Sequence, residues 1–173
     1  MNLESINRVH FIGIGGIGMS ALAKFFLYKG VEVSGYDRSK TEITLLLSNL
    51  GSHIIYHDDI SSIKDIESVD LVVFTPAISS NNVQLNHFKK TNIPIHKRAY
   101  ILGEITKSYQ TIAVAGTHGK TTTSSIMAHL LHQNNCGGVS FIGGICTNYN
   151  SNILLQEGQN AVVEADEYDR SFL

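Results

Sequence analysis

Two glycine-rich segments, residues 13–18 and 116–119, constrain the fold more than any other feature of this chain of 173 residues. Each one follows a short apolar run and precedes an amphipathic stretch with the period of a helix. A strand that runs through a glycine turn into a helix is the repeating unit of parallel α/β sheets. We therefore expect an α/β chain that contains at least two such units.

Apolar periodicity predicts where the elements lie. In the first region we expect strands at residues 9–12, 31–36, 52–56, 70–74 and 93–95, and helices at 17–29, 41–50, 83–90 and 98–106. In the second region we expect strands at residues 111–115, 139–142 and 161–163, a helix at 121–133, and a loop over the Asn-rich stretch 147–159.

A polar stretch at residues 107–110 is the best boundary between the two regions. The expected first domain, residues 1–107, is a Rossmann-like open parallel sheet with helices on both faces. The expected second domain, residues 108–173, is the start of a P-loop α/β ATPase domain. It is shorter than a nucleotide-hydrolysing domain usually is, so we expect it to be truncated.

Composition excludes several classes of protein. The hydrophobic fraction of 43% and the charged fraction of 16% are typical of a globular protein. The formal net charge of -2 gives no reason to expect nucleic acid as a partner. No apolar run approaches the ~20 residues of a membrane span, and no secretory signal precedes the first strand. The two cysteines, Cys136 and Cys146, show no metal-binding spacing. We expect reduced thiols in a cytoplasmic protein without membrane insertion.

The second glycine segment has the form of a phosphate-binding loop. Backbone N–H groups in such a turn point into one hollow, and the helix dipole adds positive potential, so phosphate binds there. Lys120 is the expected catalytic residue, on the β- and γ-phosphates of ATP, and the Thr121 hydroxyl is an expected magnesium ligand. Val114 stands where the strict motif has its first glycine, so the loop is a shorter variant. The predicted ATP-binding residues are Gly116, Thr117, His118, Gly119, Lys120, Thr121 and Thr122.

A loop of this kind needs a second magnesium ligand at the end of a neighbouring strand. The apolar run at residues 161–163 ends at Glu164, and magnesium prefers carboxylate oxygen. Spacing favours Glu164, while Asp166 and Glu167 remain alternatives. His118 has two interpretations, contact with phosphate or shaping of the turn, and we favour the second.

The first glycine segment matches G-x-G-x-x-G between a predicted strand and a predicted helix, and Asp37 follows the next strand. That pattern is typical of dinucleotide-binding loops and, taken alone, favours NAD or FAD. A UDP-sugar also carries a diphosphate and a ribose, so the loop indicates a nucleotide diphosphate. The alternative is that the glycines serve only close packing of helix on strand. The predicted binding residues are Gly13, Ile14, Gly15, Gly16, Ile17, Gly18 and Asp37.

Three further residues are added to this set from their position. Thr75 and Ala77 leave the carboxyl end of the fourth predicted strand, where loops border the ligand crevice of such sheets. Arg98 follows the fifth predicted strand. It has two interpretations, contact with a phosphate or the uracil ring, or an exposed arginine at a helix start.

Three segments, residues 11–20, 115–123 and 163–167, together resemble the Mur ligase family, and the resemblance covers essentially the whole chain. Within that family, residues 11–20 are most similar to the ligase that joins L-alanine to UDP-N-acetylmuramate. The ligase that recycles murein peptides shares the other two segments and is the alternative.

The resemblance implies an enzyme of three domains, of which this chain would hold the first, the start of the second and none of the C-terminal one. It implies ATP and Mg2+ as cofactors, and UDP-N-acetylmuramate and L-alanine as substrates, in cytoplasmic peptidoglycan precursor synthesis that supports cell shape and division. ATP would convert the muramyl carboxylate to an acyl phosphate, which the amine of L-alanine attacks. We expect a monomer or weak dimer.

Two other hypotheses belong to different functional classes. An NAD-dependent oxidoreductase would explain Gly13 to Gly18 and Asp37, but it leaves the phosphate loop without a role. A non-catalytic nucleotide-binding module would use both loops for binding alone.

Overall fold

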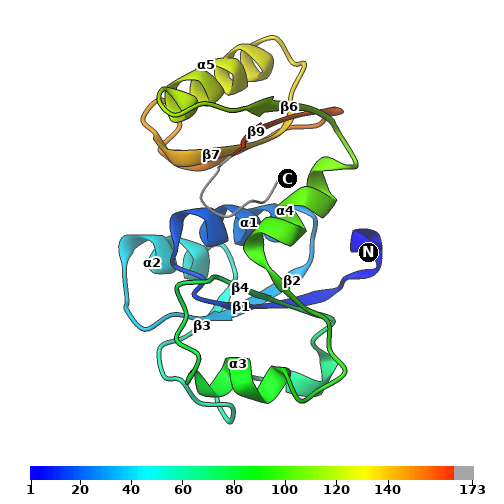
Figure 1. Cartoon of the computed structure of the whole chain (residues 1–173), viewed down its shortest axis with the longest axis vertical. Helices are drawn as coiled ribbons and strands as arrows, with labels where there is room; N and C mark the ends of the chain where they lie inside the picture. The colour runs from blue at the N-terminus through cyan, green and yellow to red at the C-terminus, as the bar shows by residue number, and fades with distance from the viewer. Residues whose placement is uncertain (166–173) are drawn as a thin grey trace. The chain divides into compact units, whose positions relative to one another are not determined.

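A computed structural model describes residues 1–165 of the chain. The chain divides into two compact units, residues 1–101 and the part from residue 102 onward. Each unit is built around one sheet with its own helices (Figure 1). The division at residues 107 and 108 that the sequence suggests stays a prediction.

The sheet of the first unit has five parallel strands in the order β3-β2-β1-β4-β5. The strands are β1 (Arg8–Ile12), β2 (Glu32–Tyr36), β3 (His53–Ile55), β4 (Leu71–Phe74) and β5 (Ile95–Lys97), and the helices are α1 (Ile17–Tyr28), α2 (Glu42–Asn49), α3 (Val83–Phe88) and α4 (Arg98–Thr106), which crosses the division between the units. Two short 3-10 turns lie at Leu3–Ser5 and Ile66–Ser68. Because β1 lies between β2 and β4, the strand order reverses at its carboxyl end, where ligands bind in open α/β sheets.

Strand β1 lies in the middle of this sheet, with helices on both faces. Helices α1 and α2 cover one face and α3 covers the other (Figure 1). On the first side Phe11 meets Phe26 of α1, with ring centroids 6.1 Å apart. On the second side His10 faces Phe88 of α3 at 5.5 Å. Alternate side chains of β1 therefore enter different cores, as the period of a strand requires, and the expected open parallel sheet is confirmed.

The second unit has four strands in the order β6-β9-β7-β8. Its elements are β6 (Gln110–Val114), α5 (Lys120–Gln133), β7 (Gly138–Cys146), β8 (Ser151–Leu155) and β9 (Asn160–Glu164). Strand β9 pairs in parallel with β6 and with β7, and its three central residues, 161–163, have no exposed surface. Helix α5 packs on this sheet through Ser124 and Ala128, so the predicted start of a P-loop α/β domain is confirmed.

The predicted loop at residues 147–159 is wrong in part, because it contains β8, which pairs antiparallel with β7. Only residues 147–150 form the hairpin turn, in which Asn150 has φ +46. Asn152 in β8 is buried although it is polar, so the apolar periodicity of the sequence did not predict this strand. Strand β5 also begins later than predicted, because Pro94 lacks the N–H that a ladder needs and contributes only its carbonyl, to Val72.

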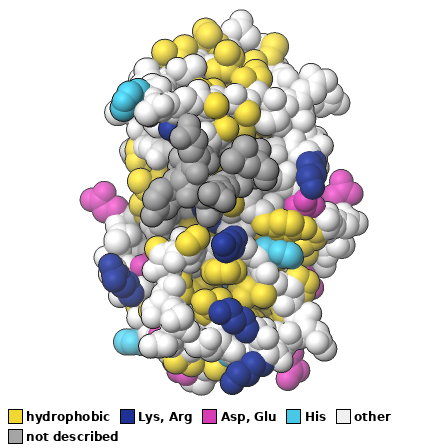
Figure 2. All heavy atoms as spheres, viewed as in Figure 1, with side chains coloured by type: hydrophobic (Ala, Val, Ile, Leu, Met, Phe, Trp, Pro, Cys, Tyr) yellow, Lys and Arg dark blue, Asp and Glu magenta, His cyan; other side chains and the backbone are white. Residues whose placement is uncertain are grey.

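Within residues 1–165, no helix combines the length and the apolar character that crossing a bilayer requires. Figure 2 shows basic and acidic side chains scattered over one face of the molecule, and they are not segregated by sign.

Candidate nucleotide-binding sites

The first glycine loop joins β1 to α1 and is closed by contacts that exclude side chains. Gly13 has φ +88 and donates its N–H to the carbonyl of Tyr36 at 2.8 Å. A Cβ at Gly13 would lie 2.6 Å from Cγ2 of Thr75, and one at Gly15 would lie 2.8 Å from Oδ2 of Asp37. Both positions need glycine for close approach, so packing explains part of the glycine pattern.

Asp37, which follows β2, holds this loop in place. Its Oδ2 accepts the Gly15 N–H at 2.8 Å, and its Oδ1 accepts the Ser39 N–H at 3.1 Å. A carboxylate has about four acceptor positions, so capacity remains for a ribose hydroxyl. The structure thus gives Asp37 a role that the sequence did not predict, and its contact with ribose stays a prediction.

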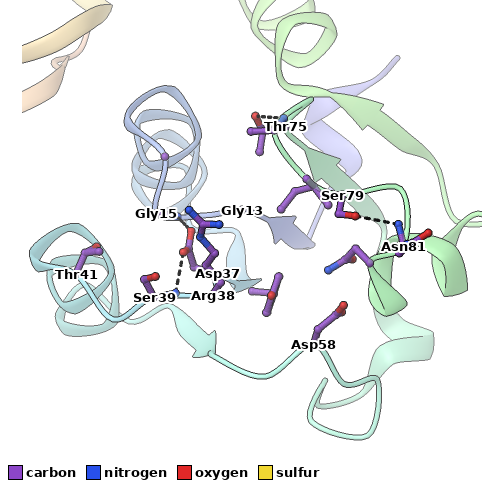
Figure 3. Close-up of a pocket in the computed structure, with 15 residues that line it drawn as sticks. Gly13, Gly15, Asp37, Arg38, Ser39, Thr41, Asp58, Thr75, Ser79 and Asn81 are labelled. Carbon is purple, nitrogen blue, oxygen red and sulfur yellow. Dashed lines mark hydrogen bonds between the residues drawn. The ribbon is translucent and has the colours of Figure 1, made fainter.

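A cavity of about 690 Å³ opens beside the loop, within the usual range for small-molecule sites (Figure 3). Six of the predicted residues line it, namely Gly13, Gly15, Gly16, Asp37, Thr75 and Ala77. Four other predicted residues do not. Ile14 is buried in the core, Ile17 is exposed, and Arg98 lies across Gly18, where a Cβ would be 2.9 Å from the Cδ of Arg98.

The cavity also has walls that the sequence did not predict. They consist of Tyr36, Arg38, Ser39, Thr41, Asp58, Ile78, Ser79, Asn81 and Asn82. In Figure 3, Asp37, Arg38 and Ser39 lie on one side of the hollow and Ser79 and Asn81 on the other, with Asp58 between them at the base of the view. Arg38 and Ser39 follow the carboxyl end of β2, so the rule that suggested Thr75 would have found them. Asp58 follows the carboxyl end of β3, so the same rule would have found it as well.

The phosphate loop joins β6 to α5 in the second unit. Gly116 has φ +143, and Gly119, the residue before the first turn of α5, has φ +77. Gly119 has no side chain that could cap the helix, so the first N–H groups of α5 are open to an anion. The Lys120 ammonium donates to the Gly116 carbonyl at 2.6 Å and so lies over the loop. The side chain of His118 is exposed, and both of its interpretations stay open.

Glu164 ends β9 and is aligned with Val114, the last residue of β6. Its Oε2 accepts the Thr121 hydroxyl at 3.2 Å, which brings the two predicted metal ligands together. Its Oε1 accepts the Ser124 hydroxyl at 2.9 Å and the Gly143 N–H at 2.8 Å. Neither Ser124 nor Gly143 was predicted from sequence. A Cβ at Gly143 would lie 2.6 Å from Oε2, so a side chain there would displace the Glu164 carboxylate from this position.

A hydroxyl and a carboxylate oxygen side by side fit a hard cation such as magnesium, which takes few protein ligands and completes its shell with water and phosphate. Among the residues that the structure describes, no three His, Cys, Asp or Glu side chains gather as a metal cluster. The alternatives Asp166 and Glu167 lie outside those residues.

A second, smaller cavity of about 350 Å³ begins at Thr121 and Thr122 and extends to the turn between β7 and β8. His129 and Cys146 line it, and His129 Nδ1 is 2.7 Å from the hydroxyl of Tyr149. It therefore adjoins the phosphate loop.

Comparison with known families gives two matches. The family described as Mur ligase family, catalytic domain, matches residues 8–110, and the Mur ligase middle domain matches residues 114–168. A curated relative named UDP-N-acetylmuramate–L-alanine ligase, from Flavobacterium johnsoniae, is 51% identical over 175 aligned positions that cover 100% of this chain and 39% of the relative. The chain therefore spans about two fifths of the length of such relatives.

Solved structures are also similar. A UDP-N-acetylmuramate–alanine ligase from Thermotoga maritima has a TM-score of 0.81 and 32% identity, over 91% of this chain and 37% of its own. A UDP-N-acetylmuramate:L-alanyl-gamma-D-glutamyl-meso-diaminopimelate ligase from Neisseria meningitides has a TM-score of 0.84 and 28% identity, over 95% of this chain and 54% of its own. The two backbones are about equally similar, so the fold does not separate these two activities.

Proposed function

Because the chain belongs to the Mur ligase family, we propose that it carries the UDP-substrate site and the phosphate loop of an ATP-dependent ligase that joins L-alanine to UDP-N-acetylmuramate. The observation that carries this proposal is the contact between Thr121 and Glu164 beside the loop that holds Lys120. A phosphate loop, a hydroxyl and a carboxylate in this arrangement are what phosphoryl transfer from ATP needs.

In the second unit the residues act by position and charge. Lys120 neutralises the transferring phosphoryl group after its ammonium leaves the Gly116 carbonyl, and the N–H groups at the start of α5 hold phosphate oxygens. Thr121 and Glu164 would hold Mg2+, which neutralises charge on the β- and γ-phosphates. In this proposal the muramyl carboxylate lies near Thr121 and takes the γ-phosphoryl group, with release of ADP, to become an acyl phosphate. The amine of L-alanine then attacks the acyl carbon, and inorganic phosphate leaves.

In the first unit the larger cavity would bind the UDP moiety. Its volume of about 690 Å³ suits a nucleotide, the glycine loop allows a diphosphate to approach the backbone, and Asp37 retains acceptors for ribose. Arg38, which also lines this cavity, supplies a positive charge that could pair with phosphate.

Sequence favours the L-alanine branch of the family. A curated relative named for L-alanine ligation is 51% identical, and among the solved structures the identity is 32% to the alanine ligase and 28% to the L-alanyl-gamma-D-glutamyl-meso-diaminopimelate ligase. The recycling ligase is the second candidate, since its backbone is as similar. The proposal includes peptidoglycan precursor synthesis in the cytoplasm and a monomer or weak dimer.

Titration calorimetry tests the substrate. We expect UDP-N-acetylmuramate to bind with one site per chain and NAD to give no heat. Binding of NAD without a response to the UDP-sugar would mean that the first unit serves an oxidoreductase. A ligation assay with L-alanine or with a murein peptide as the acceptor amine separates the two branches of the family.

A further inference from the structure

Three polar side chains form a hydrogen-bonded chain inside the first unit, away from the glycine loop. His10 on β1 and Gln84 on α3 have no exposed surface, and Ser34 on β2 is half-buried. The Nδ1 of His10 is 2.9 Å from the Ser34 hydroxyl, and its Nε2 is 2.9 Å from Oε1 of Gln84. These hydrogen bonds connect β1, the central strand of the sheet, to α3, the helix that covers it.

The contacts of Gln84 fix the direction of these hydrogen bonds. Its side-chain NH2 donates to the carbonyl of His57 at 3.4 Å and to that of Asp59 at 3.2 Å. Carbonyls only accept, so the amide oxygen must be the atom that faces His10, and His10 donates from Nε2. Nδ1 then accepts from Ser34. Burial lowers the pKa of His10 to about 4, so this neutral form persists at physiological pH.

Gln84 and Asp58 link the loop at residues 57–59 to the first turn of α3 in both directions. While Gln84 donates to the carbonyls on either side of Asp58, the Asp58 carboxylate accepts the N–H groups of Val83 at 2.8 Å and Gln84 at 3.1 Å. Four hydrogen bonds thus join segments about 25 residues apart in sequence. The loop has no helix or strand of its own, so these bonds largely determine where it lies.

The same loop and helix start form one wall of the larger cavity. Asp58, Asn81 and Asn82 all line it. In Figure 3 Asn81 lies opposite Asp37 and Arg38, with Asp58 between the two sides. We infer that His10 and Gln84 are positioning residues for the nucleotide cavity, since they anchor the Asp58 loop to the core and so fix the width of the hollow. This inference rests on the proposed binding of UDP in that cavity.

A role in stability alone explains the buried hydrogen bonds of His10 and Gln84 less well than a positioning role does. Replacing both partners of a buried hydrogen bond by apolar groups of similar shape is close to neutral for stability. The core around Phe88 could therefore be apolar at these two positions. An apolar side chain at position 84 could not donate hydrogen bonds to the carbonyls of the loop, whereas Gln84 donates two.

The test compares Gln84→Met with Phe26→Leu in the full chain. Gln84→Met keeps the side-chain volume but removes every side-chain hydrogen bond of Gln84. Phe26→Leu loosens the core on the opposite face of the sheet and is the matched control. Two readouts are taken, the Kd for UDP by calorimetry and amide hydrogen exchange over residues 56–60 without ligand. We expect Gln84→Met to raise the Kd and to speed the exchange, each about tenfold, while Phe26→Leu changes neither.

Other results contradict the inference. Unchanged exchange in Gln84→Met would show that the loop does not depend on Gln84, and equal effects in both variants would show general destabilisation. If Gln84→Met does not fold, His10→Leu replaces it, with an expected change of about threefold in the same direction, and no change there overturns the inference. Failure of the unaltered chain to bind UDP would refute the proposed function, while the exchange readout would still judge the anchoring of the loop.

Discussion

The two glycine loops are the same local unit in different surroundings. Strand β1, which enters the first loop, is in the middle of its sheet and has helices on both faces, whereas β6, which enters the phosphate loop, is largely exposed. A Cβ at Gly13 or Gly15 would collide with Thr75 or Asp37, but a Cβ at Gly119 would meet nothing within 4 Å. Glycine therefore serves close packing in the first loop, together with backbone conformation at Gly13, whereas at Gly119 in the second loop it serves backbone conformation alone.

This difference suggests two ways of preparing a loop for phosphate. The first loop is held by Asp37, which accepts the Gly15 N–H and keeps further acceptor positions free, so a ligand need not disturb this contact. The second is held by the groups that would meet the ligand, Lys120 on the Gly116 carbonyl and Glu164 on the Thr121 hydroxyl. Binding at the second loop must therefore exchange existing contacts for new ones. The predictions below test this contrast, from the largest expected effect to the smallest.

The largest effect should come from Lys120→Ala. Loss of the ammonium removes charge stabilisation at the phosphoryl group, so in a protein of the relatives' full length the ligation rate should fall about a thousandfold in an assay of L-alanine incorporation. UDP-sugar binding should stay unchanged, because the cavity of the first unit does not involve Lys120. Ligation that persists in this variant would contradict the role assigned to Lys120.

The second prediction concerns pH and the first unit alone. The pKa of His10 in the folded state is about 4, below the ~6.5 of an unfolded histidine, so protons favour the unfolded chain. Stability is fully present above about pH 6.5 and should fall by up to about 3 kcal/mol as the pH drops to about 4. Urea unfolding at several pH values measures this slope, and His10→Leu should flatten it. An equal slope in that variant would assign the pH dependence to other groups.

The third prediction sets the two kinds of glycine against each other. Gly15→Ala places a Cβ 2.8 Å from Asp37 and 2.9 Å from Thr44, which should cost about 1–3 kcal/mol of stability and weaken UDP binding. Gly119→Ala meets open space and should cost only about 1 kcal/mol, from its positive φ. Thermal unfolding of the two variants measures both costs. Equal costs would remove the distinction between packing and conformation.

The smallest effect should come from Ser124→Ala, which removes one of the two donors that hold Oε1 of Glu164. Residues that orient a metal ligand typically affect metal affinity 10- to 100-fold, and the Gly143 N–H remains here. We therefore expect Mg2+-dependent ATP binding to weaken about tenfold. Ser125→Ala, one residue along α5, is the control, and an equal loss there would point to helix destabilisation.

Local patterns predicted the order of the elements, because apolar periodicity and the glycine turns are properties of short segments. They also predicted that Thr121 and Glu164 lie close together, since neighbouring parallel strands end at the same edge of a sheet. The contacts of Gln84 with the Asp58 loop and of Gly143 with Glu164 could not be predicted this way. They depend on which distant segments meet, and no spacing within one segment encodes that.

The register between β6 and β9 has a consequence for variation in chain length. Glu164 lies opposite Val114 only because the two strands are paired residue by residue from Gln110 and Asn160 onward. One residue inserted within β9 would turn the carboxylate to the other face of the sheet and separate it from Thr121. The hairpin turn at residues 147–150 can absorb extra residues at small entropic cost. Homologous chains should therefore differ in length at this turn and keep a constant length from residue 160 to 164.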